Sequence, residues 1–242
     1  MTDVTTPRRF KRVVLKLSGE ALTGQGTHGL DGATLARIAR DLAVAAGDGT
    51  EIAVVVGGGN FFRGVQGSGK GLERARADAI GMLATVMNGL ALERAIESEG
   101  RPARALSAIA MPTLLETYTR VAALRHLSKG RVVICAGGTG NPFFTTDTGA
   151  ALRAAELEAD AILKATKVDG VYTADPKRDP GAKRYEKLTH DEAIAKNLGV
   201  MDTAAFALAR ENGIPVFVFS IAEEGAIAAA LRGEGRGTLV VP

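Results

Sequence analysis

Short apolar runs rich in Val, Ile and Leu recur along the chain, and most are followed by a polar or glycine-rich turn. Such runs are typical of strands that are buried on both faces. We expect strands at residues 12–17, 52–56, 103–106, 131–135, 161–164, 215–219 and 238–241. Because segments with helical periodicity separate most of them, the sequence predicts an α/β fold with a mainly parallel sheet covered on both faces.

The segments between these strands predict the helices. We expect helices at residues 31–46, 72–99, 116–127, 148–159, 191–196, 202–212 and 223–231, with Asp31 and Asp202 as N-terminal caps. Within the longest helix, residues 79–92 carry no charge and are apolar on nearly every side. This run is shorter than the roughly 20 residues that cross a membrane. It therefore predicts a core helix or a subunit interface.

The composition is that of an ordinary soluble globular protein, with 46% hydrophobic and 24% charged residues in a chain of 242. Thirty basic and 27 acidic residues are interspersed, which argues against a dedicated nucleic-acid binder but allows a basic pocket for small phosphates. Cys135 is the single cysteine and lies in an apolar run, so we expect a buried, inert thiol and a reducing compartment. The three histidines match no metal-ligand spacing.

Residues 1–12 contain no apolar segment of the kind found in secretory signals, and residues 1–11 are interpreted as a mobile tail. Polar loops follow four of the predicted strands, at residues 18–19, 57–60, 137–147 and 165–175. Ligands of parallel sheets bind beyond the carboxyl ends of the strands. One site built from four strand ends is therefore expected.

The loop at residues 137–147 has the sequence Gly-Gly-Thr-Gly-Asn-Pro-Phe-Phe-Thr-Thr-Asp, between a predicted strand and a predicted helix. This arrangement presents backbone N–H groups to an anion. Thr145 and Thr146 add hydroxyl groups, and Asp147 adds a carboxylate that could orient a lysine or a metal ion. A helix cap would by itself explain Thr146 and Asp147, so the loop alone leaves both interpretations open.

Lys16 interrupts an apolar strand, two residues before Ser18. A lysine in a buried strand needs a partner, so Lys16 either faces solvent from an edge strand or points to phosphate oxygens at the strand end. The glycines at residues 57–59, followed by Asn60, allow a ligand to approach the backbone closely. Arg63 could bind a phosphate through two N–H groups, or it could be an exposed charge.

Further candidates lie on the long helix and after the strand at residues 161–164. Asp78 could accept hydrogen bonds from ribose hydroxyls, although the helix dipole alone would favour an acid there. Lys164 and Lys167 could neutralise a triphosphate, and Tyr172 and Asp175 could flank a purine. The alternative for this segment is a β-hairpin with a proline-terminated turn.

Two glycine-rich segments match nucleotide-binding motifs in part. Residues 24–29 fit the dinucleotide pattern G-x-G-x-x-G, but the next strand ends in glycines instead of the acid that would hold a ribose. Residues 64–71 nearly fit a P-loop, but Gly71 replaces the Ser or Thr that would hold Mg²⁺. We interpret residues 64–71 as a flexible, solvated loop and do not expect a dinucleotide site at residues 24–29.

Taken together, four blocks resemble the bacterial uridylate kinases of the amino acid kinase superfamily. They are residues 16–20, residues 57–60 with 63–64, residues 140–147 and residues 164–176, and residues 82–91 are also similar. The resemblance covers essentially the whole chain, and the block at residues 140–147 is its most specific part. It implies a three-layer αβα sandwich and a single domain over residues 12–242, with a UMP-side half at about 12–160 and an ATP-side half at about 161–242.

The resemblance also implies an activity, the transfer of the γ-phosphoryl group of MgATP to UMP in pyrimidine nucleotide biosynthesis. The catalytic residues would be Lys16, Asp147 and Lys164, with Asp147 organising the lysines. The ATP side would comprise Lys16, Leu17, Ser18, Gly19, Gly59, Arg63, Thr166, Tyr172 and Asp175. The UMP side would comprise Gly58, Arg63, Asp78, Thr139, Gly140, Asn141, Pro142, Phe143, Phe144, Thr145 and Thr146.

Assembly and regulation are implied in the same way. The family suggests a cytoplasmic homohexamer without nucleic-acid or membrane partners, a dimer contact through the apolar helix, and Mg²⁺ held mainly by nucleotide phosphates. Many members are activated by GTP and inhibited by UTP. The residues that match the region associated with GTP activation are Gly24, Gln25, Gly26, Thr27, His28 and Gly29, while Glu93 and Glu97 are unusual neighbours for a nucleotide phosphate.

Two alternatives stay open at this point. The same fold phosphorylates acetylglutamate, glutamate, aspartate or carbamate, and it can also serve as a non-catalytic shell that holds a nucleotide or an oxyanion.

Overall fold

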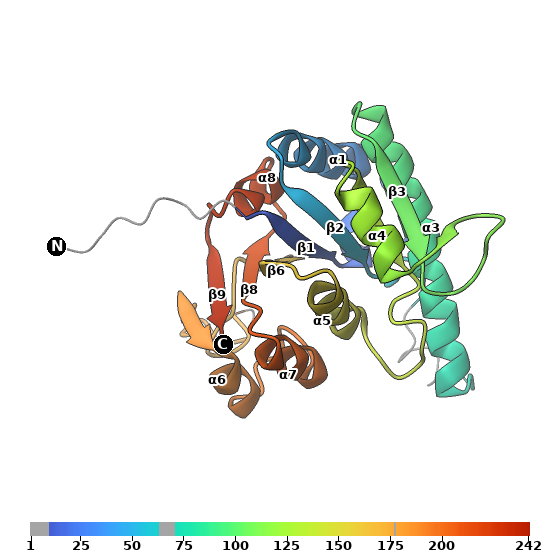
Figure 1. Ribbon diagram of the computed structural model, residues 1–242. Coiled ribbons are helices and arrows are strands. Elements are labelled where there is room, and N and C mark those ends of the chain that lie inside the picture. The colour runs from blue at the N-terminus through green and yellow to red at the C-terminus, as the bar shows by residue number, and fades with distance from the viewer. Residues whose placement is uncertain (1–9, 63–70, 177) are drawn as a thin grey trace.

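A computed structural model of the chain describes residues 10–62, 71–176 and 178–242 (Figure 1). Its described residues form a nine-stranded sheet with the order β4-β3-β5-β2-β1-β6-β8-β9-β7. The strands are β1 Arg12–Leu17, β2 Glu51–Val56, β3 Ala103–Ser107, β4 Glu116–Thr117, β5 Val132–Ala136, β6 Ala161–Thr166, β7 Lys187–Thr189, β8 Val216–Ser220 and β9 Gly237–Val241. Neighbouring strands are parallel except β8 and β9, which confirms the predicted mainly parallel sheet.

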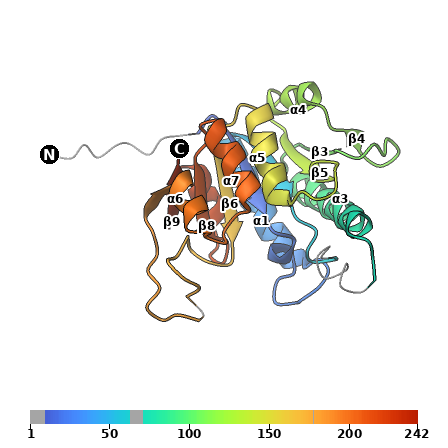
Figure 2. The ribbon, with the colours of Figure 1, turned by 90° about the horizontal axis from the view of Figure 1, so that it is seen from below.

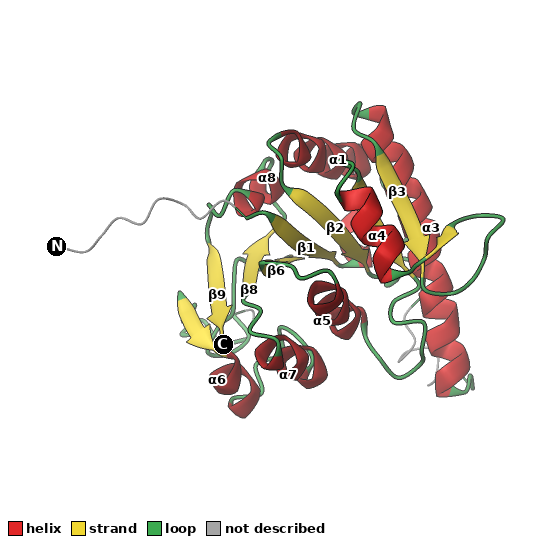
Figure 3. Cartoon of the chain, viewed as in Figure 1, coloured by secondary structure: helices red, strands yellow, loops and turns green. Residues whose placement is uncertain are grey.

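Helices cover both faces of this sheet (Figures 2 and 3). One face carries α1 Gly32–Gly47, α3 Arg74–Ser98 and α8 Ala226–Leu231, and the other carries α4 Arg120–Leu127, α5 Thr146–Glu156, α6 His190–Ala195 and α7 Thr203–Glu211. A 3-10 helix, η1 Gly19–Leu22, follows β1. The three-layer αβα sandwich expected from the resemblance is therefore confirmed.

The two faces of the sheet divide the core into two apolar clusters. In β1, Val13 and Leu15 belong to the cluster under α1, whereas Val14 belongs to the cluster under α5. Side chains alternate between the faces along a strand, so Lys16 is on the same face as Val14. By the same alternation in β6, Ile162 and Lys164 are on the α5 face.

Three element predictions need correction. The helix expected at residues 116–127 begins only at Arg120, because Thr119 caps it and residues 116–117 pair with β3 as β4. The strand β7 was not predicted, since it has only three residues and one of them is buried. The helix expected at residues 148–159 runs from Thr146 to Glu156, because Thr145 is its N-terminal cap.

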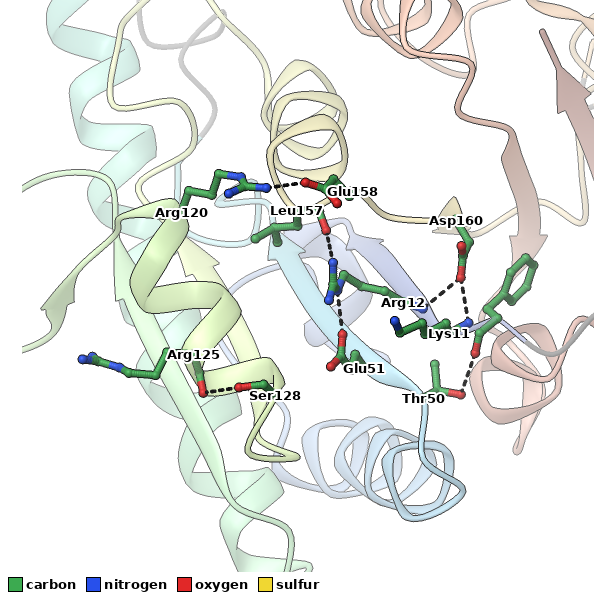
Figure 4. Close-up of polar contacts among 11 residues, drawn as sticks. Lys11, Arg12, Thr50, Glu51, Arg120, Arg125, Ser128, Leu157, Glu158 and Asp160 are labelled. Atoms are coloured by element: carbon green, nitrogen blue, oxygen red, sulfur yellow. Dashed lines mark hydrogen bonds and ion pairs between the residues drawn. The ribbon is translucent and has the colours of Figure 1, made fainter.

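At the amino ends of the central strands, ion pairs and hydrogen bonds join the neighbouring segments (Figure 4). The Asp160 carboxylate accepts hydrogen bonds from the backbone N–H groups of Lys11 and Arg12. The Arg12 side chain bonds Glu51 at 2.6 Å and the carbonyl of Leu157. These contacts join β1, β2 and the start of β6 at the amino ends of the strands, opposite the carboxyl ends where the site is predicted.

Helix α3 is long and apolar enough to cross a membrane by length and composition alone. Its inner face nevertheless packs on the sheet, with Leu92 and Ile96 fully buried in the α1-side cluster. Its outer face exposes Ile80, Leu83 and Met87. The core-helix prediction thus holds for the inner side of α3 only, and the exposed apolar residues lie on its opposite side.

Candidate active site

Lys16, Lys164 and Asp147 meet at the carboxyl ends of β1 and β6. Lys16 and Lys164 are direct partners in the register of the two parallel strands, and both are buried. The Nζ atom of Lys16 lies 2.8 Å from Asp147 Oδ1, and the Nζ atom of Lys164 lies 2.6 Å from Asp147 Oδ2. The first contact is an ion pair without hydrogen-bond geometry, whereas Lys164 donates a hydrogen bond. One carboxylate therefore holds two ammonium groups side by side.

Burial shapes the pKa values of this trio. Burial by itself would raise the pKa of Asp147, but the charges of Lys16 and Lys164 hold that pKa below its ordinary value. Burial also lowers the pKa of Lys164 to about 8, and the Asp147 carboxylate counteracts only part of this effect. Asp147 is thus an anion at neutral pH, and Lys164 is a cation close to its titration range. The trio presents net positive charge to the strand ends.

Asp147 is positioned by the start of α5. Thr145 is the N-terminal cap, and its hydroxyl accepts hydrogen bonds from the backbone N–H groups of Asp147 and Thr148. An acid in the first turn is favoured by the helix dipole. The capping interpretation thus applies to Thr145, one residue before the predicted position, and Asp147 remains free to bind both lysines.

Asp202, predicted only as a helix cap, also contacts this segment. Its carboxylate caps α7 through the backbone N–H of Ala205. It also accepts hydrogen bonds from the hydroxyls of Thr145 and Thr148. Asp202 therefore joins the start of α7 to the start of α5. Sequence reasoning missed this role because a cap accounted fully for an aspartate at that position.

The glycine loops after β1 and β2 pack directly against each other. A Cβ atom at Gly19 would lie 2.7 Å from both Gly57 O and Gly59 N, and one at Gly57 would lie 3.0 Å from Gly19 N. A side chain at Gly19 is therefore excluded unless the loops separate. The predicted phosphate-side residues Leu17, Ser18, Gly19 and Gly59 are brought together at the same strand ends as Lys16.

A cavity lies between α3 and the loop before α5, and we call it the α3–α5 cavity. Its lining comprises Gly58, Phe62, Asp78, Gly81, Met82, Thr85, Gly138, Thr139, Asn141, Phe144, Thr145 and Thr146. Seven of the predicted UMP-side residues are among them, whereas Gly140, Pro142 and Phe143 are not. Sequence reasoning missed the contributions of Gly81, Met82 and Thr85, which follow from the packing of α3 beside the loop.

Asp78 fixes the conformation of the loop opposite it. One of its oxygens, Oδ2, accepts hydrogen bonds from the backbone N–H of Phe143 and from Arg74, each at 2.8 Å. Phe143 has a φ of 71°, a left-handed conformation that is unusual for a bulky residue. Asp78 therefore holds Phe143 in an unfavourable backbone conformation while it also lines the α3–α5 cavity.

A second cavity lies beside the two glycine loops, and we call it the His28 cavity. Its lining comprises Glu20, Thr23, Gly26, Thr27, His28, Gly59, Phe61, Phe62 and Lys167. The segment at residues 24–29, for which the resemblance predicts a GTP response, thus contributes Gly26, Thr27 and His28 to a cavity that Gly59 also lines. Lys167 is exposed at its edge, and the His28 ring packs edge-on against Phe61.

The predicted adenosine residues have partners of their own. The Thr166 hydroxyl bonds the backbone of Val168, and the Tyr172 hydroxyl donates to Asp169 at 2.6 Å. Tyr172 also forms an antiparallel bridge with Arg184, so this segment has the hairpin pairing considered as its alternative. Asp175 forms an ion pair with Arg178. Thr166, Tyr172 and Asp175 are not among the residues that line the α3–α5 cavity or the His28 cavity.

Arg63, a predicted contact of both nucleotides, and most of the P-loop-like segment at residues 64–71 lie outside the described residues. The edge-strand interpretation of Lys16 is wrong, because β1 is flanked on both sides by β2 and β6. Lys16 finds its partner in Asp147 instead.

Comparison with known proteins agrees with this geometry. The model of the amino acid kinase family matches residues 11–220. A uridylate kinase of Azorhizobium caulinodans is 63% identical over 233 residues, which cover 96% of this chain and 98% of that protein. A uridylate kinase of a Bradyrhizobium species is 62% identical over 231 residues, which cover 96% of this chain and 97% of that protein.

Solved structures give the same result. The UMP kinase of Bacillus anthracis superposes with a TM-score of 0.92 at 40% identity, over 97% of each chain. The UMP kinase of Ureaplasma parvum superposes with a TM-score of 0.91 at 37% identity, over 97% of this chain and 100% of that one. The resemblance to bacterial uridylate kinases that the sequence motifs predict is confirmed. The chain belongs to the amino acid kinase family.

Proposed function

We propose that this chain is a UMP kinase, which transfers the γ-phosphoryl group of ATP to UMP and yields UDP and ADP. The observation that carries the proposal is the trio of Lys16, Asp147 and Lys164 at the strand ends. During transfer, the phosphoryl group carries negative charge on its oxygens. Cations that the protein holds in place stabilise this charge without having to reorganise. The similar proteins are named uridylate kinase and UMP kinase, and these names are our reason for proposing UMP as the phosphoryl acceptor.

In this proposal the α3–α5 cavity receives UMP. Thr139, Asn141 and Thr146 offer hydroxyl and amide groups to a base and a ribose, and Asp78 offers its remaining carboxylate oxygen to a ribose hydroxyl. Thr145 borders the same cavity, while its hydroxyl caps α5 and donates to Asp202. The phosphate of UMP would point toward Gly58 and the lysines. Such a cavity suits a nucleoside better than a small amino acid, because it joins polar groups to apolar contacts from Met82 and Phe144.

ATP would approach from the side of β1 and β6. The backbone of Ser18, Gly19 and Gly59 would bind its phosphates, and Lys16 and Lys164 would lie beside the transferred group. Thr166, Tyr172 and Asp175 remain our proposal for the adenosine contacts, which would require the segment at residues 166–176 to exchange some of its internal hydrogen bonds. The protein then contributes position and charge, and it forms no covalent intermediate.

A divalent cation is expected with the ATP. Among the described residues, no group of three or more His, Cys, Asp or Glu side chains could hold a metal ion. Asp147 already binds two lysines. The donor set therefore suits a cation held mainly by phosphate oxygens of the nucleotide, as is common for Mg²⁺, and such a cation would neutralise part of the phosphate charge.

Assembly, location and regulation are further parts of the proposal. The exposed residues Ile80, Leu83 and Met87 suit the dimer contact of a cytoplasmic homohexamer. Loop 24–29 at the His28 cavity is our candidate for an effector response to GTP, and UTP inhibition would accompany it. A GTP titration that leaves the UMP saturation curve unchanged would contradict the effector proposal alone.

An acceptor panel tests the proposed function. Purified protein is incubated with radiolabelled ATP, Mg²⁺ and one acceptor at a time: UMP, CMP, acetylglutamate, glutamate, aspartate or carbamate. We expect labelled UDP as the dominant product. A preference for carbamate or an amino acid would identify the chain as a kinase of the same fold that acts on another acceptor. No turnover with any acceptor would favour a non-catalytic protein that holds a nucleotide or an oxyanion.

A further inference from the structure

Two fully buried asparagines form a pair directly beneath the glycine loops. Asn60 Nδ2 donates to Asn88 Oδ1 at 2.9 Å, and Asn88 Nδ2 donates to Asn60 Oδ1 at 2.7 Å. Asn60 belongs to the loop after β2 and Asn88 to α3, so the pair joins two elements that are far apart in the sequence. Each amide is at once donor and acceptor toward the other.

The second N–H of each amide binds a backbone carbonyl. Asn60 Nδ2 also donates to Gly29 O at 2.9 Å, and Asn88 Nδ2 also donates to Gly57 O at 2.7 Å. Because a carbonyl oxygen only accepts, both amides are fixed in one orientation. The four side-chain polar atoms of the pair are thus all hydrogen-bonded, which makes their complete burial tolerable.

The pair also lies against the loop after β1. A Cβ atom at Gly19 would lie 2.5 Å from Asn60 Oδ1, so Gly19 packs tightly on the Asn60 amide. The backbone N–H of Gly29 donates to the Asn60 carbonyl at 2.9 Å, which adds a second link to the loop before α1. Three loops that border the strand ends therefore meet at one side chain, that of Asn60.

One turn earlier on α3, Thr85 makes the corresponding contact on the other side of the site. Its hydroxyl donates to Met82 O at 2.6 Å and accepts from the backbone N–H of Gly137 at 2.7 Å. Gly137 begins the loop that leads to Asp147. Helix α3 thus holds the loop after β2 through Asn88 and the loop after β5 through Thr85.

We propose that the Asn60–Asn88 amide pair is a positioning element of the active centre. The pair sets the distance of the Gly57–Gly59 backbone from α3 and from Ser18–Gly19. It thereby fixes the positions of the backbone N–H groups that are proposed to bind phosphate. This inference rests on the proposed kinase function. Neither asparagine is proposed to touch substrate, so both act through the glycine loops.

The physical reason lies in the glycines themselves. Glycine has more backbone freedom than any other residue, and three in succession would sample many conformations. Preorganised donors stabilise charge well because they do not reorganise during the reaction. The carbonyl of Gly57 is fixed by Asn88, and the next polar side chain, Asn60, is fixed by the same partner. The flexible segment is thus clamped at both ends.

The test replaces Asn88 by leucine, which has similar size but no donor or acceptor. The chain offers a matched control in Leu92→Ala, because Leu92 is buried one turn further along the same helix and makes only apolar contacts. Both variants are purified, their folding is checked by circular dichroism and thermal unfolding, and kcat and KM are measured for UMP and for ATP. We expect Asn88→Leu to lower kcat/KM for both nucleotides on the order of 10- to 100-fold, as a small misplacement of binding groups does.

Comparison with the control separates positioning from stability. We expect Leu92→Ala to lower the Tm at least as much as Asn88→Leu while it leaves kcat and both KM values within about twofold of wild type. Equal kinetic losses in the two variants would overturn the proposal, and so would unchanged kinetics in folded Asn88→Leu. Should Asn88→Leu fail to fold, Asn88→Ser removes the same pairing with a smaller polar group and is judged by the same criteria.

A binding measurement keeps the inference independent of turnover. Should wild type show no phosphoryl transfer to UMP, the proposed function fails, but calorimetric titration with ATP still tests the pair. We then expect Asn88→Ser to weaken ATP binding on the order of tenfold relative to wild type and to Leu92→Ala. Equal affinities in the three proteins would overturn the positioning role.

Discussion

Lys16 and Lys164 are direct neighbours across two parallel strands, and each contributes its ammonium group to a different oxygen of Asp147. Like charges on adjacent strands normally repel and destabilise a sheet. Here the α5 face places both lysines under one carboxylate, which makes their proximity tolerable.

Lys16→Ala should lower turnover far more than stability. The variant removes one cation from the reacting group but leaves Asp147 paired with Lys164. We expect kcat to fall on the order of 100-fold or more, as when one preorganised charge-stabilising group is lost. The exposed Lys129, after α4, provides the control Lys129→Ala, which should be kinetically silent. Unchanged turnover in Lys16→Ala would reject its catalytic role.

Asp147→Asn should be strongly destabilising. The neutral amide leaves two buried ammonium groups side by side without the carboxylate that both contact, and breaking a buried ion pair in this way costs about 3–5 kcal/mol. Denaturant unfolding measures the loss. The double variant Asp147→Asn/Lys164→Met removes the repulsion, so it should recover much of the stability but none of the activity. Full stability in Asp147→Asn would show that the lysines do not depend on this carboxylate.

Activity and stability should respond to alkaline pH in opposite directions. Burial lowers the pKa of Lys164 to about 8 from an ordinary 10.5, so its ammonium group loses its proton in the folded protein as the pH rises through 8. We expect kcat/KM, which reports the free enzyme, to fall above about pH 8. Between pH 8 and 10.5 the unfolded chain binds this proton more readily than the folded chain, so the contribution of Lys164 to the free energy of unfolding rises.

The variant Lys164→Met provides the reference for that measurement. Other groups also change the pH dependence in this range. The Cys135 thiol, for example, has an ordinary pKa of 9.0 in the unfolded chain, and burial raises its pKa to about 12 in the folded protein. The difference in unfolding free energy between wild type and Lys164→Met isolates the lysine. A difference that decreases from pH 8 to 10 would contradict the lowered pKa.

Gly58→Ala should weaken UMP binding. A Cβ atom at Gly58 would lie 2.6 Å from Gly81 O and 2.8 Å from the Ala84 side chain, so the loop and α3 must separate. Both border the α3–α5 cavity. We expect a lower Tm and a KM for UMP raised about tenfold or more. Gly32→Ala, in the first turn of α1 with open space around it, should leave both quantities unchanged or raise the Tm slightly.

Cys135 should be unreactive in the folded protein. It lies in β5, fully covered, and burial raises the pKa of its thiol to about 12. Because the thiolate is the reactive form, an aromatic disulfide reagent should release no colour from native protein and about one equivalent after unfolding in denaturant. Rapid labelling of native protein would show that β5 opens to solvent.

The sequence predicts the central strands because burial on both faces leaves continuous apolar runs, as in residues 132–136. It does not predict β4 or β7, because two or three mostly accessible residues carry no such pattern. These strands exist only because the neighbouring strands β3 and β9 offer free hydrogen-bonding edges. The limit is physical, since a short strand at the side of a sheet is specified by its neighbour.

The candidate site could also be predicted only in part from the sequence. Lys16, Lys164 and Asp147 could be proposed from their positions at strand ends, but strand order alone shows that Lys16 lies in the centre of the sheet. The contacts of Asp202 with Thr145 and of Asn60 with Asn88 join residues 57 and 28 positions apart. Such contacts depend on how helices pack, which hydrophobic periodicity does not specify.

Helix α3 has one further consequence. Its 25 residues form a rod about 37 Å long, and the part near its amino end borders the α3–α5 cavity while Ile80, Leu83 and Met87 face outward. A hydrogen-bonded helix resists bending over one turn. A partner that shifts Ile80, Leu83 and Met87 would therefore shift the α3 wall of the cavity by nearly the same distance. Contact at the outer surface of α3 would thus change the shape of the α3–α5 cavity.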